Sequence, residues 1–209
     1  MEILRLNDTN LAGCAARGAA ALRAGGIVLY PTDTLYGLGA DAFSDGAVAK
    51  IFDIKDRRDD KPIHAIVSDL AMAREYGDIP EAANVLVETF GGKVTLIVRK
   101  REFDTGIVRG LTTFGFRIPD NDLCKAMLAA FGKPITATSA NKSGAPTGRR
   151  IDAILAQLGE AAEKIDLVID AGELPERMPS SVVDLSGAQP RVLREGAIST
   201  VDIFATLAI

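Results

Sequence analysis

Short apolar runs recur along the chain, and longer segments with helically spaced apolar residues separate them. Short runs rich in valine, isoleucine and leucine are typical of strands buried in a sheet. The clearest run is Val-Thr-Leu-Ile-Val at residues 94–98. From this pattern we expect strands at residues 3–6, 27–30, 62–67, 94–98, 114–118, 135–138, 167–170, 182–185 and 191–193.

Helices are predicted where apolar residues return once per helical turn and where capping residues stand at the ends. The pair Gly25-Gly26 follows an alanine-rich segment and is typical of a helix C-terminus. We expect helices at residues 9–22, 45–54, 70–76, 80–90, 121–130 and 151–158, and a short one near the end of the chain. The segment 31–39, which contains two glycines, is predicted to be a loop.

The predicted strands and helices alternate irregularly, and some strands near the middle and the end follow one another without a helix. This order favours an α/β fold with a single mixed sheet flanked by helices over a wholly parallel sheet. No internal repeat, low-complexity tract or linker divides the sequence. We therefore expect a single domain over residues 1–209.

The composition is that of a soluble globular protein, since 47% of the residues are hydrophobic and 25% are charged. No apolar run approaches the roughly 20 residues that span a bilayer, and the start has no signal-peptide block, so we expect no membrane contact and a cytoplasmic location. The net charge of −4 argues against a protein that coats nucleic acid along its length. Cys14 and Cys124 are expected to be free, buried thiols.

The densest group of polar side chains is Thr-Ala-Thr-Ser-Ala-Asn-Lys-Ser-Gly at residues 136–144. Burying such groups without partners costs about 1–3 kcal/mol each, so we expect a polar ligand such as a phosphate, a carboxylate or a ribose. A surface loop is the alternative. Other basic and hydroxyl residues favour an anion-binding enzyme site. They are Lys55, Arg57, Arg58, Arg117, Ser180, Ser181 and Arg194.

Three of these cations have specific chemistry. Strand alternation places Phe116 and Ile118 on one face and Arg117 on the other. If the second face is buried, Arg117 needs an anionic partner, either the carboxylate of a small substrate or a structural aspartate. Lys55 and Arg57 offer a compact charge and a planar fork for phosphate oxygens. Their alternative is a solvent-facing position at the end of a helix.

No catalytic triad can be assembled, because His64 is the only histidine and stands in an apolar strand, where a structural role is more common. No closely spaced pair of carboxylates stands out, although Asp33, Asp120 and Asp184 could each help to hold a metal. An enzyme with these residues works mainly by positioning and charge stabilisation, the pattern expected for nucleotidyl transfer.

Several segments match the blocks of a known family in order and spacing. They are Tyr30-Pro-Thr-Asp-Thr-Leu-Tyr-Gly-Leu38, Lys55 and Arg57 with Lys61-Pro62, residues 113–119, Thr138-Ser-Ala-Asn141 with Ser143-Gly144, Ser180-Ser-Val-Val-Asp184 and Arg194-Glu-Gly196. On these blocks the chain resembles the YrdC-like (TsaC) family of threonylcarbamoyl-AMP synthases over about residues 27–197. Such an ordered set is far more specific than any single motif.

The resemblance implies a twisted α/β domain with a large concave ligand cavity lined by positive charge. It implies a nucleotidyltransferase that makes threonylcarbamoyl-AMP and pyrophosphate from ATP, L-threonine and bicarbonate. Downstream tRNA-modifying proteins are the expected partners, because the product feeds the threonylcarbamoyladenosine modification of tRNA. Mg²⁺ is expected with ATP, since the polyphosphate charge needs neutralising.

The resemblance also implies roles for individual residues. The expected threonine-binding residues are Thr34, Arg117 and Ser180, with Arg117 on the carboxylate. The expected ATP-binding residues are Arg57, Lys61, Thr113, Ser139, Asn141, Thr147 and Arg194. The expected catalytic residues are Lys55 and Arg57.

Three positions depart from the family pattern. Ser181 stands where threonine is common, and it keeps a hydroxyl. Glu195 replaces a common proline and puts a carboxylate beside Arg194, which we expect to weaken nucleotide binding. Ile66 stands where some members have a histidine; His64 lies two residues earlier, on the same side of the strand, and is a candidate substitute.

Two other functions fit the resemblance. The first is a YciO-like paralogue that binds double-stranded RNA or tRNA and lacks the synthase activity. The second is carbamoyl transfer, as in the related domain of hydrogenase-maturation proteins.

Overall fold

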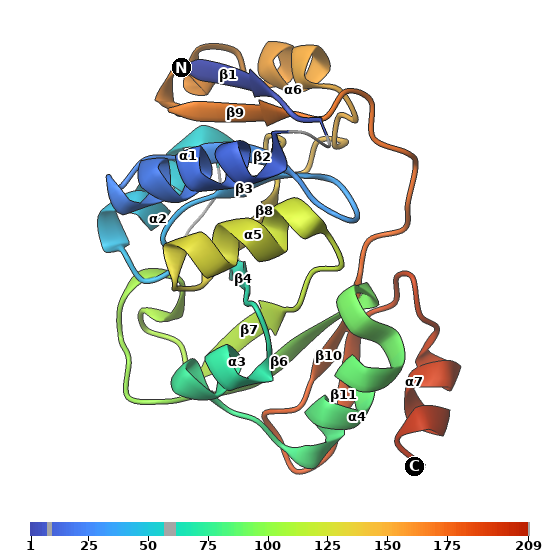
Figure 1. Cartoon of the computed structure of the whole chain (residues 1–209). Helices are drawn as coiled ribbons and strands as arrows, with labels where there is room; N and C mark the ends of the chain where they lie inside the picture. The colour runs from blue at the N-terminus through green and yellow to red at the C-terminus, as the bar shows by residue number, and fades with distance from the viewer. Residues whose placement is uncertain (8–9, 57–61, 209) are drawn as a thin grey trace.

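The computed structural model describes residues 1–7, 10–56 and 62–208, and in this part of the chain eleven strands form one mixed sheet. The strands are β1 (Glu2–Arg5), β2 (Val28–Pro31), β3 (Tyr36–Gly39), β4 (His64–Ile66), β5 (Gly77–Asp78), β6 (Val94–Lys100), β7 (Thr113–Arg117), β8 (Ile135–Ser139), β9 (Leu167–Asp170), β10 (Ser181–Asp184) and β11 (Arg191–Arg194). Their order is β1-β9-β2-β3-β8-β4-β7-β6-β10-β11 (Figure 1). Off this path, β5 pairs with β6. Parallel and antiparallel pairs both occur, so the predicted mixed sheet is confirmed.

Helices flank the sheet, as the apolar periodicity predicted. The α-helices are α1 (Leu11–Arg23), α2 (Asp45–Lys55), α3 (Leu70–Tyr76), α4 (Glu81–Phe90), α5 (Asp122–Phe131), α6 (Ile151–Leu158) and α7 (Thr200–Thr206). Short 3₁₀ helices lie at Gly91–Lys93, Gly106–Val108 and Gly159–Lys164. The predicted bounds of α3, α6 and β9 match the structure at both ends, and most other bounds differ by one or two residues.

The prediction of a loop over residues 31–39 is wrong for Pro31, which ends β2, and for the last four residues, which form β3. The two glycines of Tyr-Gly-Leu-Gly lower the strand propensity of this segment. Tertiary pairing decides the conformation, because β3 lies between β2 and β8 and hydrogen-bonds to both. Gly39 is also required by packing, since a Cβ there would come within 2.7 Å of the Tyr30 ring.

Hydrophobic cores lie on both faces of the sheet. On one face α1 and α5 lie side by side (Figure 1), and Leu22 packs with Met127 and Leu128 against the strands. On the other face, α2 and α6 contribute Ile51 and Ile154 to a second core. Helices that cover both faces of a mixed sheet give the layered α/β architecture that the sequence predicted.

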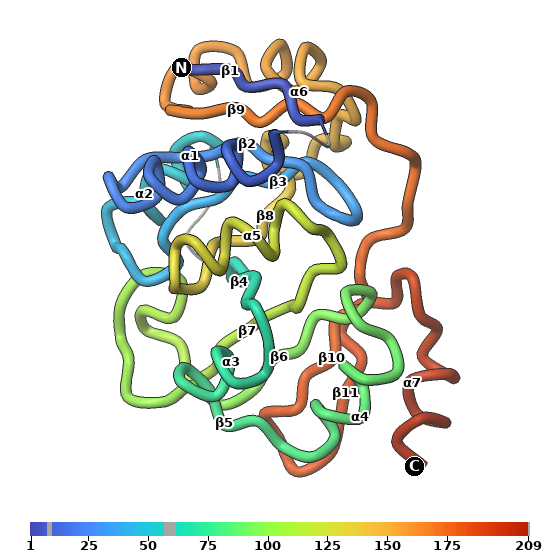
Figure 2. The backbone as a smooth tube through the Cα atoms, viewed as in Figure 1, coloured from blue at the N-terminus to red at the C-terminus, as the bar shows by residue number. Residues whose placement is uncertain are grey.

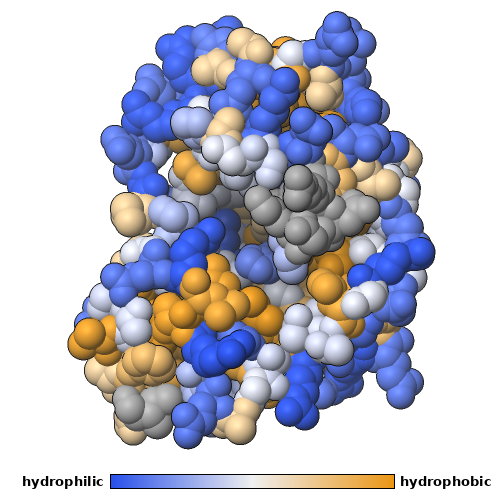
Figure 3. Space-filling model, turned by 180° about the vertical axis from the view of Figure 1, so that it is seen from behind, coloured by the Kyte–Doolittle hydropathy of each residue, from blue (hydrophilic) through white to orange (hydrophobic). Residues whose placement is uncertain are grey.

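An extended segment, residues 171–180, connects β9 to β10 and runs along one side of the molecule (Figure 2). The phenol of Tyr36 donates to Gly172 O over 2.8 Å and holds the start of the segment. Arg177 Nη1 donates to Asp33 O over 2.6 Å and holds its middle. The segment therefore stays against the turn that follows β2. Seen from behind, the surface has a recess between the upper and lower halves of the molecule (Figure 3).

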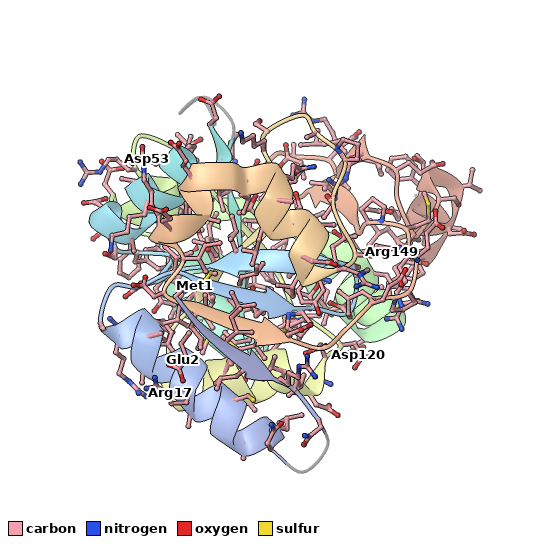
Figure 4. The ribbon with its side chains drawn as sticks, turned by 90° about the horizontal axis from the view of Figure 1, so that it is seen from above. Met1, Glu2, Arg17, Asp53, Asp120 and Arg149 are labelled. Carbon is pink, nitrogen blue, oxygen red and sulfur yellow. The ribbon has the colours of Figure 1, made fainter. Side chains whose placement is uncertain are left out.

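At the upper edge of the sheet, Arg17 on α1 forms an ion pair with Glu2 on β1, and the two side chains lie next to each other in Figure 4. Both side chains are about half exposed, so the pair contributes little to stability. Within the described ranges, no helix has both the length and the apolar character needed to span a membrane.

Both thiols are free and buried, as predicted. Burial raises the pKa of Cys14 and of Cys124, which lowers the fraction of reactive thiolate. We expect neither thiol to react with an aromatic disulfide reagent in the folded protein near neutral pH, and both to react once guanidinium unfolds it. Rapid release of the chromophore from the native protein would contradict this burial.

Candidate functional site

A cavity of about 250 Å³ lies on one face of the sheet, where β8, β4 and β7 are neighbours. The strand register places Ser139, Ala137, His64, Gly115 and Arg117 on this face, because directly paired residues point the same way. Ala137 and Gly115 have little or no side chain, which leaves room above the strands. His64 lies over Gly115, where a Cβ would come within 2.4 Å of the imidazole. Gly115 thus makes room for the His64 imidazole, and the small side chain of Ala137 leaves space for the hollow.

The structure brings together all three residues predicted to bind threonine. Thr34 comes from the turn after β2, Arg117 from the end of β7 and Ser180 from the residue before β10. Of the predicted ATP-binding residues, Ser139 and Arg194 line the same cavity. Five residues that are far apart in sequence therefore meet at one site.

Other predicted residues have different places. Thr113 and Thr147 are not among the described residues that line the cavity. Asn141 is buried directly behind Ser139, whose hydroxyl donates to Asn141 Oδ1 over 2.6 Å. Arg57 and Lys61 lie outside the described residues. The ATP-binding roles of all these residues stay predictions, as does the large size expected for the cavity.

Arg117 has hydrogen-bonding capacity that the protein does not use. Its Nη1 donates to Asp33 Oδ1 over 2.7 Å and to Gly92 O over 3.2 Å. Among residues 1–7, 10–56 and 62–208, neither Nε nor Nη2 has a partner. The structural aspartate that the sequence left open is therefore Asp33, and the rest of the guanidinium remains available to a carboxylate.

The turn after β2 presents Thr34 as a hydrogen-bond acceptor. Thr32 Oγ1 donates its only proton to Leu35 O over 2.7 Å. In the 3.1 Å contact between the two hydroxyls, Thr34 is then the donor. The remaining lone pairs of the Thr34 hydroxyl can accept from a ligand that carries N–H or O–H groups.

Hydroxyls and a second guanidinium line the opposite side of the cavity. Ser180 Oγ lies 2.8 Å from Thr95 Oγ1, and Arg194 Nη2 donates to Ser180 O over 2.7 Å. Burial and then repulsion from the Arg117 guanidinium lower the pKa of Arg194. Two guanidinium groups that repel each other across a cavity favour an anionic ligand between them.

Lys55 is buried, with 1% of its surface exposed, so the solvent-facing alternative is wrong for this residue. Its ammonium donates to Ser139 O, to Asn141 O over 2.9 Å and to Asn141 Oδ1 over 2.8 Å. Its own carbonyl accepts from Ser143 N over 2.8 Å. Lys55 thus holds the turn that follows β8. The catalytic role expected for it stays a prediction.

The interpretation of residues 136–144 as ligand-seeking is wrong for Thr136. This side chain is fully buried; its hydroxyl donates to Leu38 O and accepts from Ala40 N, each over 2.9 Å. Thr136 therefore fixes β8 against β3 and the residue that follows it. Ala137, Thr138 and Ser139 of this segment line the cavity, and the Ser139 hydroxyl is linked to the Lys55 network.

His64 and Ile66 point to the same side of β4, as the two-residue step predicted. His64 lines the cavity, whereas Ile66 packs into the core under α1 and α5. The position of the family histidine is thus part of the core in this protein. That His64 takes over the role of this histidine stays a prediction.

Glu195 lies next to Arg194 in sequence, but its carboxylate turns elsewhere. Glu195 Oε2 accepts from Thr200 N over 2.8 Å, at the start of α7. This hydrogen bond lowers the pKa of Glu195. Arg194 instead contacts Ser180, so the structure gives no ion pair between the two neighbours to weaken nucleotide binding.

The described residues provide no protein-held metal centre. Asp33 pairs with Arg117, Asp120 with Lys125 and Asp184 with Arg191. Across the described ranges, no group of three or more His, Cys, Asp or Glu residues is close enough to bind one ion. The three aspartates thus form no such cluster in this part of the chain, and the part that each could take in holding a metal stays a prediction.

Thr95 is a polar residue of the site that was missed from the sequence. It is 3% exposed and stands within the apolar run of β6, where a lone threonine passes for an ordinary strand residue. The signal that could have found it is a hydroxyl on the face of the sheet shared with Arg117.

The family follows from comparison with known sequences. The model of the Sua5/YciO/YrdC family, described as telomere recombination, matches residues 20–196. The chain belongs to this family. The match spans every element from the end of α1 to the residues after β11.

Individual relatives of this family member are similar over most of its length. The threonylcarbamoyl-AMP synthase of Bacillus subtilis is 33% identical and covers 98% of this chain, which spans 58% of that protein. The crystal structure of Pyrococcus abyssi Sua5 complexed with L-threonine is 30% identical, with a TM-score of 0.87 over 99% of this chain and 60% of that one. Escherichia coli YciO is 25% identical, with a TM-score of 0.82 over 97% of this chain and 98% of its own.

Replacing Lys55 with methionine is expected to lower the free energy of unfolding by about 3 kcal/mol, because buried acceptors on Ser139 and Asn141 lose their donor. Urea unfolding measures this loss. Lys50→Met is the matched control on the same helix, since its exposed ammonium contacts only Gly25 O among the described residues. That control is expected to change stability by less than about 0.5 kcal/mol. Equal stability of Lys55→Met and the wild type would refute the buried network.

Proposed function

We propose that this protein is an L-threonylcarbamoyl-AMP synthase, a nucleotidyltransferase that uses ATP, L-threonine and bicarbonate. The observation that carries the proposal is Arg117, a 7% exposed guanidinium whose Nε and Nη2 have no partner among the described residues. A relative with the same fold has been solved with L-threonine, and other relatives are named as this synthase.

The threonine site needs groups for a carboxylate, an amine and a hydroxyl. The free edge of Arg117 suits the carboxylate, because a guanidinium can donate two parallel hydrogen bonds to its two oxygens. Thr34 suits a donor such as the amine or the side-chain hydroxyl, since its own proton is directed to Thr32. Ser180, supported by Thr95, closes the opposite side.

The nucleotide side of the proposal rests on Ser139 and Arg194. Arg194 is an exposed residue that lines the cavity, and its charge, close enough to Arg117 to be repelled by it, would attract a phosphate. Lys55 and Asn141 keep Ser139 in place from behind. Arg57, Lys61, Thr113 and Thr147 are further proposed ATP-binding residues, assigned by family resemblance alone.

The proposed chemistry needs close placement of two substrates and no covalent link to the protein. The threonine amine combines with bicarbonate: a C–N bond forms, a C–O bond of bicarbonate breaks, water leaves and a carbamate results. A carbamate oxygen then forms a bond to the α-phosphorus of ATP, while the bond from this phosphorus to the bridging oxygen breaks and pyrophosphate leaves. Guanidinium groups on both sides of the cavity would stabilise the charge that develops during transfer.

Magnesium enters the proposal as part of the substrate MgATP. The described residues offer no carboxylate cluster for it, and Mg²⁺ commonly binds substrate phosphates and keeps several waters. Its chemistry would be to neutralise the polyphosphate charge. A cytoplasmic location and downstream tRNA-modifying proteins as partners complete the proposal, because the product is consumed in tRNA modification.

Purified protein with ATP, bicarbonate and threonine is expected to release pyrophosphate, and omission of threonine is expected to abolish the release. A coupled pyrophosphate assay over a range of Mg²⁺ concentrations measures it. No threonine-dependent release at any Mg²⁺ concentration would refute the synthase. Salt-sensitive binding of double-stranded RNA by such an inactive protein would instead favour the YciO-like alternative, which stays a prediction.

Arg117→Ala is expected to raise the KM for threonine by about tenfold to a hundredfold, since a charge-assisted pair of hydrogen bonds is lost. The KM for ATP is expected to change much less. Steady-state kinetics with each substrate varied in turn makes the comparison. Arg17→Ala is the control, because Arg17 is exposed and pairs with Glu2 at the edge of the sheet. Equal increases in both KM values would contradict the placement of threonine on Arg117.

A further inference from the structure

Asp33 contacts Arg117 from the side opposite the cavity. Arg117 is among the residues that line the cavity of about 250 Å³. Asp33 is not among the described residues lining it; with Gly92 and Ile118 it lines a neighbouring cavity of about 560 Å³. Arg117 lines the first cavity and its partner Asp33 lines the second, so the Asp33 carboxylate reaches the guanidinium from behind as seen from the proposed threonine site.

The contact of Asp33 selects which edge of the guanidinium stays free. Both hydrogen bonds of Arg117 to described residues use Nη1, with Asp33 Oδ1 at 2.7 Å and Gly92 O at 3.2 Å. Two acceptors use both protons of Nη1. Nε and Nη2 form the remaining edge. This edge is not sealed inside the protein, because no side-chain nitrogen in the described part of the chain is both fully buried and unpaired. This edge has the geometry for a bidentate carboxylate.

The position of Asp33 is itself fixed by its neighbours. Thr32 Oγ1 accepts from Thr34 N over 3.1 Å and from Leu35 N over 3.2 Å, which closes the turn on both sides of Asp33. Arg177 Nη1 donates to the carbonyl of Asp33 over 2.6 Å. The turn therefore keeps its shape through contacts that do not involve the Asp33 carboxylate.

Close packing also limits where the carboxylate can go. A Cβ at residue 92 would come within 2.5 Å of Asp33 Oδ2, so a glycine is needed there. The Asp33 side chain is 10% exposed and that of Arg117 is 7% exposed. A pair held so deeply leaves the guanidinium few alternative rotamers.

We infer that Asp33 is a positioning residue for amino-acid binding: it takes up Nη1 of Arg117 from behind and leaves the Nε–Nη2 edge directed at the substrate carboxylate. The inference rests on the proposed function for the identity of the substrate. Asp33 does not touch the substrate in this arrangement. Its charge also offsets that of Arg117, so the site before binding is held as a neutral pair rather than as an isolated buried cation.

Asp33→Asn and Asp33→Ala separate the charge of Asp33 from its hydrogen bond. Asparagine keeps an acceptor for Nη1 at the same position, whereas alanine removes it. We expect the KM for threonine to rise about tenfold in Asp33→Asn and about a hundredfold in Asp33→Ala, with the KM for ATP within about twofold of the wild type. Asp184→Asn is the matched control, because Asp184 is 12% exposed, pairs with Arg191 and lies at the far end of β10.

A readout without substrate keeps the inference testable if the synthase activity is absent. In ¹⁵N-labelled protein, the Arg117 guanidinium is expected to show hindered rotation in the wild type and in Asp184→Asn, and faster averaging in Asp33→Ala. Arg117→Ala identifies the signal. Rapid averaging in the wild type, or equal rises of both KM values in a folded Asp33→Ala protein, would overturn the inference. Failure of the wild type to release pyrophosphate would refute the proposed function alone.

Discussion

The pairing of β8 with both β3 and β4 is the constraint on which the architecture depends. It joins the strands on the β1 side to those on the β11 side, so the described strands form one sheet. Thr136 strengthens this junction because its buried hydroxyl binds backbone groups at β3 and just beyond it. The same strand carries Ala137 and Ser139 on the cavity face. The connection between the two halves of the sheet therefore also sets the position of the site.

Two buried cations lie beside this junction. They differ in how many of their N–H groups have hydrogen-bond partners in the protein. The Lys55 ammonium has oxygen partners on Ser139 and Asn141, and it organises the turn after β8. Arg117 has partners for one nitrogen and a free edge toward the cavity among the described residues. Burying a cation is costly unless it is paired, and both cations meet this requirement. Arg117 is ion-paired with Asp33 and keeps further N–H donors on its cavity edge, whereas the three protons of the Lys55 ammonium are directed to the turn after β8.

Much of the fold could be predicted because the signals are local. The pattern of apolar residues placed the helices Leu70–Tyr76 and Ile151–Leu158 at their observed bounds. The segment Tyr36–Gly39 was missed because its glycines are poor strand formers, and only its neighbours β2 and β8 make it a strand. That Thr34, Arg117 and Ser180 belong to one site could be predicted from the sequence, because they stand in motifs whose order along the chain matches that of a known family.

The sequence by itself determined the α/β class, the positions of most helices and strands, the family and a set of residues able to bind an anion. Only the tertiary structure decided which of these residues meet and which are used up inside the protein. It buried Lys55 against the turn after β8, paired Arg117 with Asp33 and turned Glu195 away from Arg194 to the start of α7. The physical reason is that periodicity is set by neighbours along the chain. The partner of a polar group depends instead on strand register and on which face of the sheet each residue occupies.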